Sequence, residues 1–251
     1  MGTAGGLVFG VGSVFGSFML EGGQVGALIL LPAMVIVFGG TIAAALIGTS
    51  AREVLGIRKL IHLTLFRPTY RLKETIESIV GFSSIARKDG LLMLDKELLR
   101  IENPFLRKLL RFAIDGTEPQ VLRSIGETEL KYVAERHARG AAIFQKMGGY
   151  SPTMGIIGTV MGLIATLAAA GQDPNELIRH IASAFIATLW GVFMANLVWL
   201  PLADKLKNIH HDEELYMDIT VEGILSIQAG EVPDSLRAKL QSMLPRELQD
   251  E

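Results

Sequence analysis

Glycines and threonines recur at helical spacing in two long apolar stretches of the chain. The first set is Gly155, Thr159, Gly162 and Thr166, and the second is Ala184, Thr188, Gly191 and Ala195. Both sets follow the positions i, i+4, i+7 and i+11, so each occupies one face of a helix. Hydroxyl and carbonyl oxygens are ligands that hard cations such as Na⁺ accept, and they can also hold water for protons.

Two interpretations of these faces stay open. Ordinary small-residue packing, with threonine hydroxyls bonded back to their own helix, accounts for the spacing without any ion. Alternatively, the two faces line a shared surface along which a cation moves. Neither stretch carries Asp, Glu, Lys or Arg near its centre, although an ion-coupled protein normally keeps such a group in the membrane. If the chain conducts ions, a partner must therefore supply the carboxylate.

Two prolines lie at comparable depth in these stretches, Pro152 at the start of the first and Pro201 at the end of the second. Proline lacks the backbone N–H and removes a helical hydrogen bond. Each proline therefore either kinks its helix or marks the helix end. Trp190 is too deep in its stretch for a membrane interface, and we expect it to pack against a neighbouring helix.

The chain has four stretches that are long and apolar enough to cross a membrane. It contains 251 residues with 49% hydrophobic side chains and a mean hydropathy of +0.37. A membrane helix needs about 20 apolar residues. The predicted spans are 3–20, 26–49, 148–171 and 180–202. Tight external hairpins join them in pairs, and in the second hairpin Asp173 is predicted to cap a helix that starts at Pro174.

Charge counts predict the orientation of the spans. Residues 50–146 hold 18 Lys and Arg against 12 Asp and Glu, whereas residues 203–251 hold 5 against 11. Lys and Arg are retained on the cytoplasmic side of membrane helices. We therefore expect a multi-pass membrane protein, surrounded by lipid, with both termini and the middle segment in the cytoplasm. The basic middle and the acidic tail are expected to pair.

The middle segment reads as consecutive helices that each stop at a glycine or proline breaker. The predicted helices are 52–65, 69–87, 91–101, 105–114 and 118–145. No strand pattern of useful length appears, so the sequence predicts an all-α membrane protein with four transmembrane helices and a cytoplasmic helical domain. Its predicted divisions are 1–50 for the first two spans, 51–146 for the cytoplasmic domain, 147–202 for the last two spans and 203–251 for a cytoplasmic helical tail.

Several classes of function are excluded by what the chain lacks. It has no cysteine, which removes thiolate metal sites and cysteine nucleophiles. It has no glycine-rich phosphate loop with Lys-Ser or Lys-Thr, and no nucleophile with a base and an oxyanion site. His210 and His211, followed by acids, match no zinc or calcium spacing. We therefore expect no enzyme activity, no metal, no cofactor and no nucleic-acid partner.

Several separated motifs together resemble the MotA/PomA flagellar stator family of the MotA/TolQ/ExbB superfamily. The motifs are residues 149–164, 184–191, 201–206 and 86–92, with shorter matches at 115–116, 140–144 and 222–226. They occur in the family order over nearly the whole chain. The resemblance implies a pentameric ring, with five copies of this subunit around two copies of a MotB/PomB-type B subunit. It also implies that the single membrane helix of the B subunit carries the ion-binding Asp.

The resemblance implies three groups of functional residues. Thr159 and Thr188 match hydroxyl positions along the conduit, and with the helical spacing the predicted lining is Gly155, Thr159, Gly162, Thr166, Thr188 and Gly191. Pro152 and Pro201 match the prolines that couple ion passage to movement. The basic pair Arg87 and Lys88, with Asp95 and the nearby Glu97, is implied to contact the rotor protein FliG. Without the resemblance, this charged segment reads first as a solvated face, and a surface that steers a partner is the alternative.

The resemblance also bears on the transported ion and on the competing functions. Thr159 with Thr188 and Asn196 is similar to the sodium-driven branch, so Na⁺ is favoured over H⁺. The residues at 187–190 depart from the Thr-Thr-Leu-Tyr that is common among sodium types. The alternative function is an ExbB/TolQ-like energiser of an envelope process, whose members usually have three spans. A membrane scaffold without ion flow is the third possibility.

Overall fold

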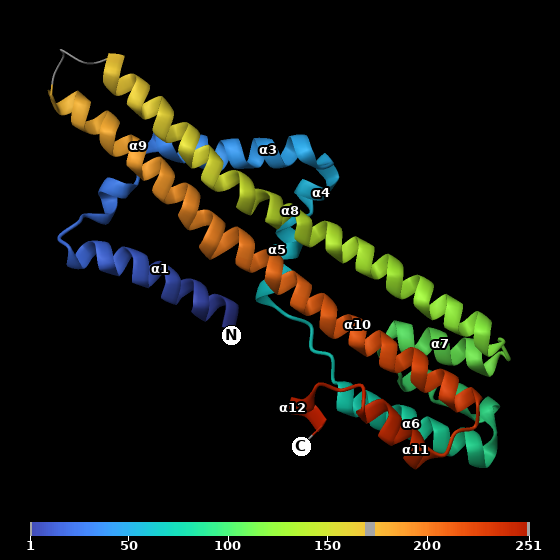
Figure 1. Ribbon diagram of the computed structural model, residues 1–251. Coiled ribbons are helices and arrows are strands. Elements are labelled where there is room, and N and C mark those ends of the chain that lie inside the picture. Colours follow the sequence, from blue (N-terminus) through green and yellow to red (C-terminus); the bar gives the residue numbers. More distant parts are fainter. Residues whose placement is uncertain (1, 169–173, 250–251) are drawn as a thin grey trace. The chain divides into compact units, whose positions relative to one another are not determined.

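The computed structural model describes residues 2–168 and 174–249, and the regular elements in those ranges are all helical (Figure 1). Four helical runs there are long and apolar enough to cross a membrane. They are Gly2–Leu20, Leu31–Gly48, Pro119–Ala168 and Pro174–Gln228. The predicted helical class and the four span-length helices are thereby confirmed. The predicted cap at Asp173 lies outside the described residues, and Pro174 is the first residue of its helix.

The first third of the chain is more broken than predicted. Its elements are α1 (Gly2–Leu20), the 3-10 helix η1 (Val25–Leu28), α2 (Leu31–Met34), the π-helix η2 (Val35–Gly39), α3 (Gly40–Gly48), α4 (Ala51–Leu55) and α5 (Ile57–Leu65). The predicted span at 26–49 is wrong at its start, because a 3-10 turn precedes the helix. Pro32 lies in the first turn of α2, where its missing N–H costs no helical hydrogen bond.

The remainder contains two long helical runs and several shorter helices. The elements are α6 (Leu72–Asp89), the 3-10 helices η3 (Leu91–Lys96) and η4 (Leu98–Arg100), α7 (Pro104–Ile114), α8 (Pro119–Ala168), α9 (Pro174–Met194), the π-helix η5 (Ala195–Trp199), α10 (Leu200–Gln228), α11 (Pro233–Gln241) and α12 (Arg246–Gln249). The α-helix predicted at 91–101 is wrong. That segment forms the 3-10 helices η3 and η4 instead, between Gly90, at φ +90°, and Pro104 at the start of α7.

Neither Pro152 nor Pro201 marks a helix end. Pro152 lies inside α8, which continues for 16 further residues to Ala168. Pro201 is the second residue of α10, which follows η5 without a break. The π-helix widens the turn directly before this proline, a change that helices accommodate at single turns. The helix-end interpretation of the two prolines is therefore wrong.

The chain divides into two compact units, residues 1–67 with 137–208 and residues 68–136 with 209–251. We call them the membrane unit and the second unit. Their borders differ from those predicted at 51, 147 and 203, because compactness and membrane topology are separate criteria. The assignment of segments to membrane and cytoplasm stays a prediction.

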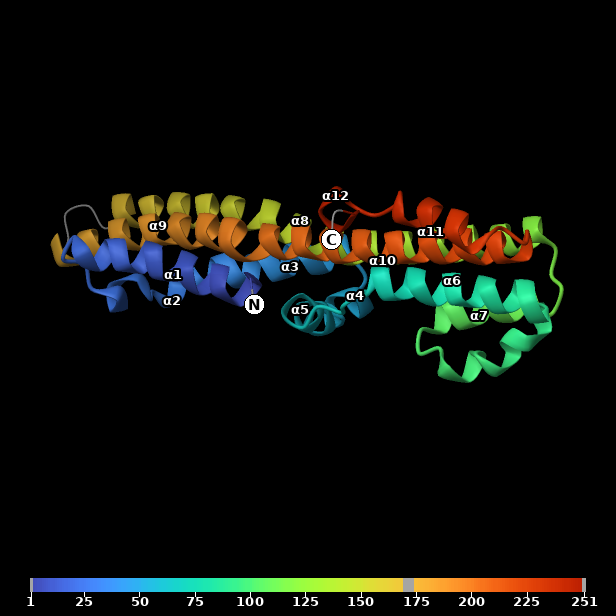
Figure 2. The same ribbon diagram turned by 90° about the horizontal axis from the view of Figure 1, so that it is seen from below.

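The second unit is built around one apolar core. On α7 the buried side chains of Leu106, Leu109, Leu110 and Ala113 follow the i, i+3, i+4, i+7 pattern of a helix with one apolar face. The helix starts where Asn103 Oδ1 accepts hydrogen bonds from the N–H groups of the first turn, which is a common N-terminal cap. Helices α6 and α11 lie side by side in both views (Figures 1 and 2). The buried leucines of α11 join the same core.

Ion pairs in this unit connect the basic middle segment with the acidic tail. In one pair the base belongs to the middle segment, and in the other the base belongs to the tail. Arg123 of the middle segment lies 3.2 Å from Glu222 of the tail, as the charge counts predicted. Arg237 of the tail lies 2.8 Å from Glu77 of the middle segment, and this hydrogen bond lowers the pKa of the Glu77 carboxyl. Such exposed pairs each contribute at most about 1 kcal/mol. They position the tail without dominating its stability.

The membrane unit is organised by the contact between α8 and α9, which lie side by side in both views (Figures 1 and 2). A Cβ added to Gly155 would lie 2.8 Å from the carbonyl oxygen of Ala187, and one added to Gly191 would lie 2.7 Å from that of Ser151. The obstructing atoms belong to the backbone and cannot rotate away. The two helices therefore touch backbone to backbone, as small residues permit in membranes.

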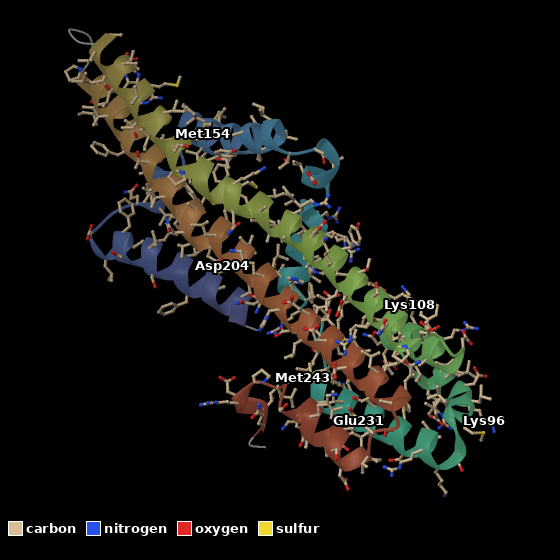
Figure 3. All side chains as sticks on the ribbon, turned by 45° about the vertical axis from the view of Figure 1, so that its right-hand side comes forward. Lys96, Lys108, Met154, Asp204, Glu231 and Met243 are labelled. Carbon is tan, nitrogen blue, oxygen red and sulfur yellow. The ribbon has the colours of Figure 1, made fainter. Side chains whose placement is uncertain are left out.

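The earlier spans pack onto this helix pair. A Cβ on Gly40 would lie 2.6 Å from the sulfur of Met154, which is labelled in Figure 3. The indole Nε1 of Trp190 donates to the carbonyl oxygen of Leu28 at 2.8 Å. The same indole contacts the rings of Phe15, Phe38 and Phe193. The prediction that Trp190 packs against its neighbours is confirmed.

Replacing Gly155 by alanine tests the backbone contact. The added methyl group would overlap the backbone of α9, and such overpacking costs about 1–3 kcal/mol. We expect Gly155→Ala to lower the melting temperature of the detergent-purified protein. Gly149 is the matched control, because its added Cβ would meet no atom within 4 Å. Gly149→Ala should leave the melting temperature unchanged or raise it, since alanine favours a helix by up to about 1 kcal/mol. Equal shifts in both variants would contradict the contact.

Candidate functional site

A cluster of oxygen atoms occupies the interface between α8 and α9. The hydroxyls of Thr159 and Thr188 are hydrogen-bonded to each other across the two helices. Thr159 Oγ1 also lies 3.1 Å from the carbonyl oxygen of Gly155 and 3.0 Å from that of Ala184. A hydroxyl has one proton to donate, so this proton serves one of these acceptors at a time. The arrangement is neutral, rich in oxygen and half-buried.

The two predicted sets of small residues face each other along this interface. Besides the contacts of Gly155 and Gly191, a Cβ on Gly162 would lie 2.8 Å from the Cβ of Ala184. Thr166 behaves differently, because its hydroxyl donates to the carbonyl oxygen of Gly162 in its own helix at 2.8 Å. The structure thus brings the two sets together within one chain. Their role as conduit lining stays a prediction.

The site has no charged group of its own. Between Met147 and Ala168 of α8, and between Ile181 and Met194 of α9, the sequence contains no Asp, Glu, Lys or Arg. Oxygen atoms of hydroxyls and carbonyls can coordinate a cation, but without a carboxylate they cannot neutralise it. In the described ranges, no group of three or more His, Cys, Asp or Glu side chains forms a metal site. A cation held here needs a negative group from another chain.

Pro152 lies one turn before Gly155 on α8, and the residue preceding it supplies the carbonyl against which Gly191 packs. Because Pro152 has no N–H, the carbonyl four residues earlier loses its usual helical donor. Pro152 and Gly155 therefore both lie on the part of α8 that contacts α9. Pro201 is exposed and follows η5 on the other helical run. The structure places only Pro152 next to the contact.

The predicted rotor-contact residues lie on one segment of the second unit. Arg87 and Lys88 are exposed in the last turn of α6, and Asp95 is exposed on η3. Leu94 and Leu98 are buried between these charges and anchor the segment to the core. Glu97 is only partly exposed and pairs with Arg100 at 3.3 Å. Within the part of the chain that the structure describes, Arg87, Lys88 and Asp95 form no ion pair within 4 Å, whereas Glu97 pairs with its neighbour Arg100.

Sequence reasoning missed two features of the site. The carbonyl oxygen of Ala184 takes part in the oxygen cluster, and no side-chain motif signals a backbone acceptor. The π-helix before Pro201 was also missed, since apolar periodicity does not separate π from α geometry. The packing glycines were found because small residues at helical spacing indicate close contact.

Comparison with known proteins identifies the family. Residues 97–219 match the MotA/TolQ/ExbB proton channel family, and residues 4–89 match the motility protein A N-terminal family. Motility protein A of Bacillus subtilis is 34% identical over 229 residues, covering 90% of this chain and 84% of the relative. Chemotaxis protein PomA of Vibrio alginolyticus is 30% identical, covering 90% of this chain and 88% of the relative.

Solved structures agree with this result. The chain is similar to one in the structure of C. jejuni MotAB, with a TM-score of 0.92 and 30% identity, over 98% of this chain and 96% of that chain. It is also similar to one in the flagellar MotAB stator complex from Bacillus subtilis, with a TM-score of 0.90 and 32% identity, over 97% of this chain and 96% of that chain. The chain therefore belongs to the MotA/TolQ/ExbB proton channel family, as a stator subunit of the motility protein A group.

Proposed function

We propose that this chain and a MotB/PomB-type partner form a cation channel that converts ion flow into torque on the flagellar rotor. The observation that carries the proposal is the oxygen cluster of Thr159 and Thr188, which lies where neither helix has an Asp, Glu, Lys or Arg, at residues 147–168 of α8 and 181–194 of α9. The partner supplies the carboxylate, and this chain supplies the neutral wall. The solved relatives are MotAB complexes, which supports a partner of the MotB type.

The energetic argument rests on the cost of a charge inside the membrane. An ionised carboxylate there is expensive, and a bound cation removes much of that cost. One elementary charge that crosses the membrane releases about 2.3 kcal/mol per 100 mV. Each neutralisation of the partner's carboxylate changes which packing of α8 and α9 is preferred. Pro152 and Pro201 are the proposed positions at which the helices respond.

Sodium is the proposed ion. The hydroxyls of Thr159 and Thr188 and two backbone carbonyls form a set of oxygens of the kind that hard cations bind. The amide of Asn196 donates to the carbonyl oxygen of Val192 at 2.9 Å, which leaves its own side-chain oxygen as an acceptor. Proton coupling is the alternative, and the swimming assay below separates the two ions.

The proposed assembly has five copies of this chain around two copies of the partner, in the bacterial inner membrane, with both termini in the cytoplasm. Helix α1 has no buried residue within the chain. An apolar helix whose whole surface is left uncovered by its own chain is covered by lipid or by another chain. This supports assembly in a membrane. Residues 51–146 and 203–251 are the proposed cytoplasmic parts, and Arg87, Lys88 and Asp95 are the proposed contacts with FliG.

Removing both hydroxyls of the threonine pair tests the conduit. Valine keeps the shape of threonine, and loss of both partners leaves no unsatisfied group behind. We expect the double variant Thr159→Val, Thr188→Val to assemble with the partner but to abolish swimming. Swimming is measured in a host without its own stator, with the cognate B subunit supplied and Na⁺ varied at constant pH.

Thr41→Val is the matched control, because Thr41 is a span threonine whose hydroxyl bonds only to its own helix. This variant should swim normally. Undiminished swimming of the double valine variant would refute the conduit. If even the unmodified chain restores no swimming in any ionic condition, an ExbB/TolQ-like energiser becomes the better assignment.

Charge reversal at the end of α6 tests the rotor contact. Both side chains are exposed, so Arg87→Glu with Lys88→Glu should leave folding and assembly unchanged. Because reversed charges repel a surface that complemented the original ones, swimming speed should fall by about half or more. Lys131→Glu, at an exposed lysine of the same unit, is the control. Equal swimming by both variants would mean that Arg87 and Lys88 are solvated charges without a role in the rotor contact.

A further inference from the structure

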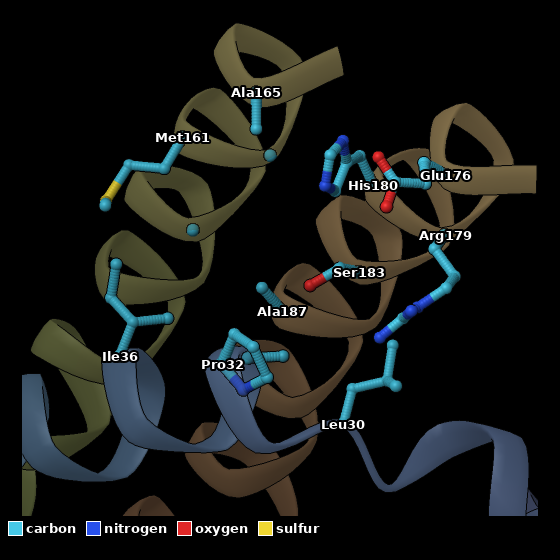
Figure 4. A pocket seen from close by; sticks show the side chains of 13 residues that line it. Leu30, Pro32, Ile36, Met161, Ala165, Glu176, Arg179, His180, Ser183 and Ala187 are labelled. Atoms are coloured by element: carbon cyan, nitrogen blue, oxygen red, sulfur yellow. The ribbon is translucent and has the colours of Figure 1, made fainter. Parts of the chain in front are cut away.

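The membrane unit contains a cavity of about 490 Å³ next to the proposed ion conduit. It lies between the start of the second span, the far part of α8 and the first turns of α9 (Figure 4). Its volume falls in the usual range of pockets for small molecules, which is roughly 300–1,000 Å³. Gly162 is the residue that it shares with the predicted conduit lining.

The cavity has an apolar part and a polar part. Leu30, Pro32, Ile36 and Met161 are among the side chains that form the apolar part. The polar part comes from the beginning of α9, and its members are Glu176, Arg179, His180 and Ser183. From Glu176 to Ala187 the wall of α9 rises by about 16 Å at 1.5 Å per residue. That length is close to half of a hydrocarbon core about 30 Å thick.

The polar groups of this cavity lack partners in the described part of the chain. Glu176 and Arg179 are exposed and three residues apart, yet no ion pair joins them within 4 Å. The Nδ1 atom of His180 is buried without a hydrogen-bond partner. A buried polar atom without a partner is costly. Figure 4 shows all three side chains on α9, with Arg179 extended toward Leu30 and with Glu176 and His180 close to each other and directed away from Arg179.

We propose that this cavity binds a phospholipid with a zwitterionic, amine-bearing head group. The guanidinium of Arg179 and an imidazole N–H of His180 donate to phosphate oxygens, and the carboxylate of Glu176 accepts from the lipid ammonium. An acyl chain occupies the apolar part. This class of lipid matches the charges of the cavity. Its head group carries a negative phosphate for Arg179 and a positive ammonium for Glu176, which lies three residues away.

Other lipid classes fit this site less well. An anionic head group such as phosphatidylglycerol satisfies Arg179 but leaves Glu176 beside a second negative charge. A choline head group has no N–H, so it cannot donate a hydrogen bond to the carboxylate. Phosphatidylethanolamine satisfies both residues. The cavity should therefore rank the three lipids in a defined order, with phosphatidylethanolamine first.

The experiment measures lipid retained by the complex of this chain with its B-type partner. The complex is purified in mild detergent, stripped of lipid, and offered equal amounts of phosphatidylethanolamine, phosphatidylcholine and phosphatidylglycerol with identical acyl chains. Bound lipid is quantified by native mass spectrometry. We expect phosphatidylethanolamine to be retained about ten-fold more strongly than the other two, as one lost charge-assisted hydrogen bond implies. The chain-free head group, glycerophosphoethanolamine, should not compete.

Two variants separate the parts of the site. Glu176→Gln should abolish the preference for phosphatidylethanolamine over phosphatidylglycerol, with Glu21→Gln as the control at the acid of the other predicted hairpin. Ala165→Leu should fill the apolar part and lower retention of all three lipids. Its control is Ala168→Leu, because Ala168 is exposed on the same helix and does not line the cavity.

Four outcomes would overturn the proposal. The first is equal retention of the three lipids by the unmodified complex. The second is no retention at all, as expected if a helix of a second copy fills the cavity. The third is an unchanged preference in Glu176→Gln, which is informative even if Ala165→Leu fails to assemble, since Glu176 is exposed. The fourth is effective competition by glycerophosphoethanolamine, which would mean that binding does not require an acyl chain.

Discussion

The backbone contact between α8 and α9 is the constraint on which the rest of the membrane unit depends. At Gly155 and Gly191 an added Cβ would lie within 2.8 Å of a backbone oxygen of the other helix. Such a separation lets the hydroxyls of Thr159 and Thr188 bond across the two helices, while Thr159 Oγ1 also stays within reach of the carbonyl oxygen of Gly155 in its own helix. The oxygen cluster is thus a consequence of glycine placement.

In the proposed function, this constraint explains why ion carriage requires a partner chain. A hydroxyl pair can exchange a mutual hydrogen bond for contact with a cation, but it cannot compensate the charge in a medium of low dielectric constant. A carboxylate from a second chain can. The remaining contacts of the unit, such as Met154 against Gly40 and Trp190 against Leu28, position the first two spans around this helix pair. They leave α1 without buried residues.

Helical spacing was enough to predict the glycine and threonine faces, because close packing of membrane helices demands small residues at that period. The depth of Trp190 in its apolar stretch was enough to predict that it packs against a neighbouring helix. Helical spacing failed at residues 91–101, which form 3-10 turns instead of an α-helix. The sequence also left open whether each proline kinks or ends its helix, because helices with tertiary support can carry proline in their interior. Backbone acceptors such as the carbonyl of Ala184, and the cavity beside α9, arise from how helices pack and leave no motif in the sequence.

The central claim is that this chain provides a neutral wall and another chain provides the charge. Ion flux into liposomes, driven by a membrane potential, tests it most directly when this chain is reconstituted alone and with its B-type partner. The account predicts flux only with the partner, and none when the partner's membrane carboxylate is replaced by an amide. Flux through this chain alone would contradict it.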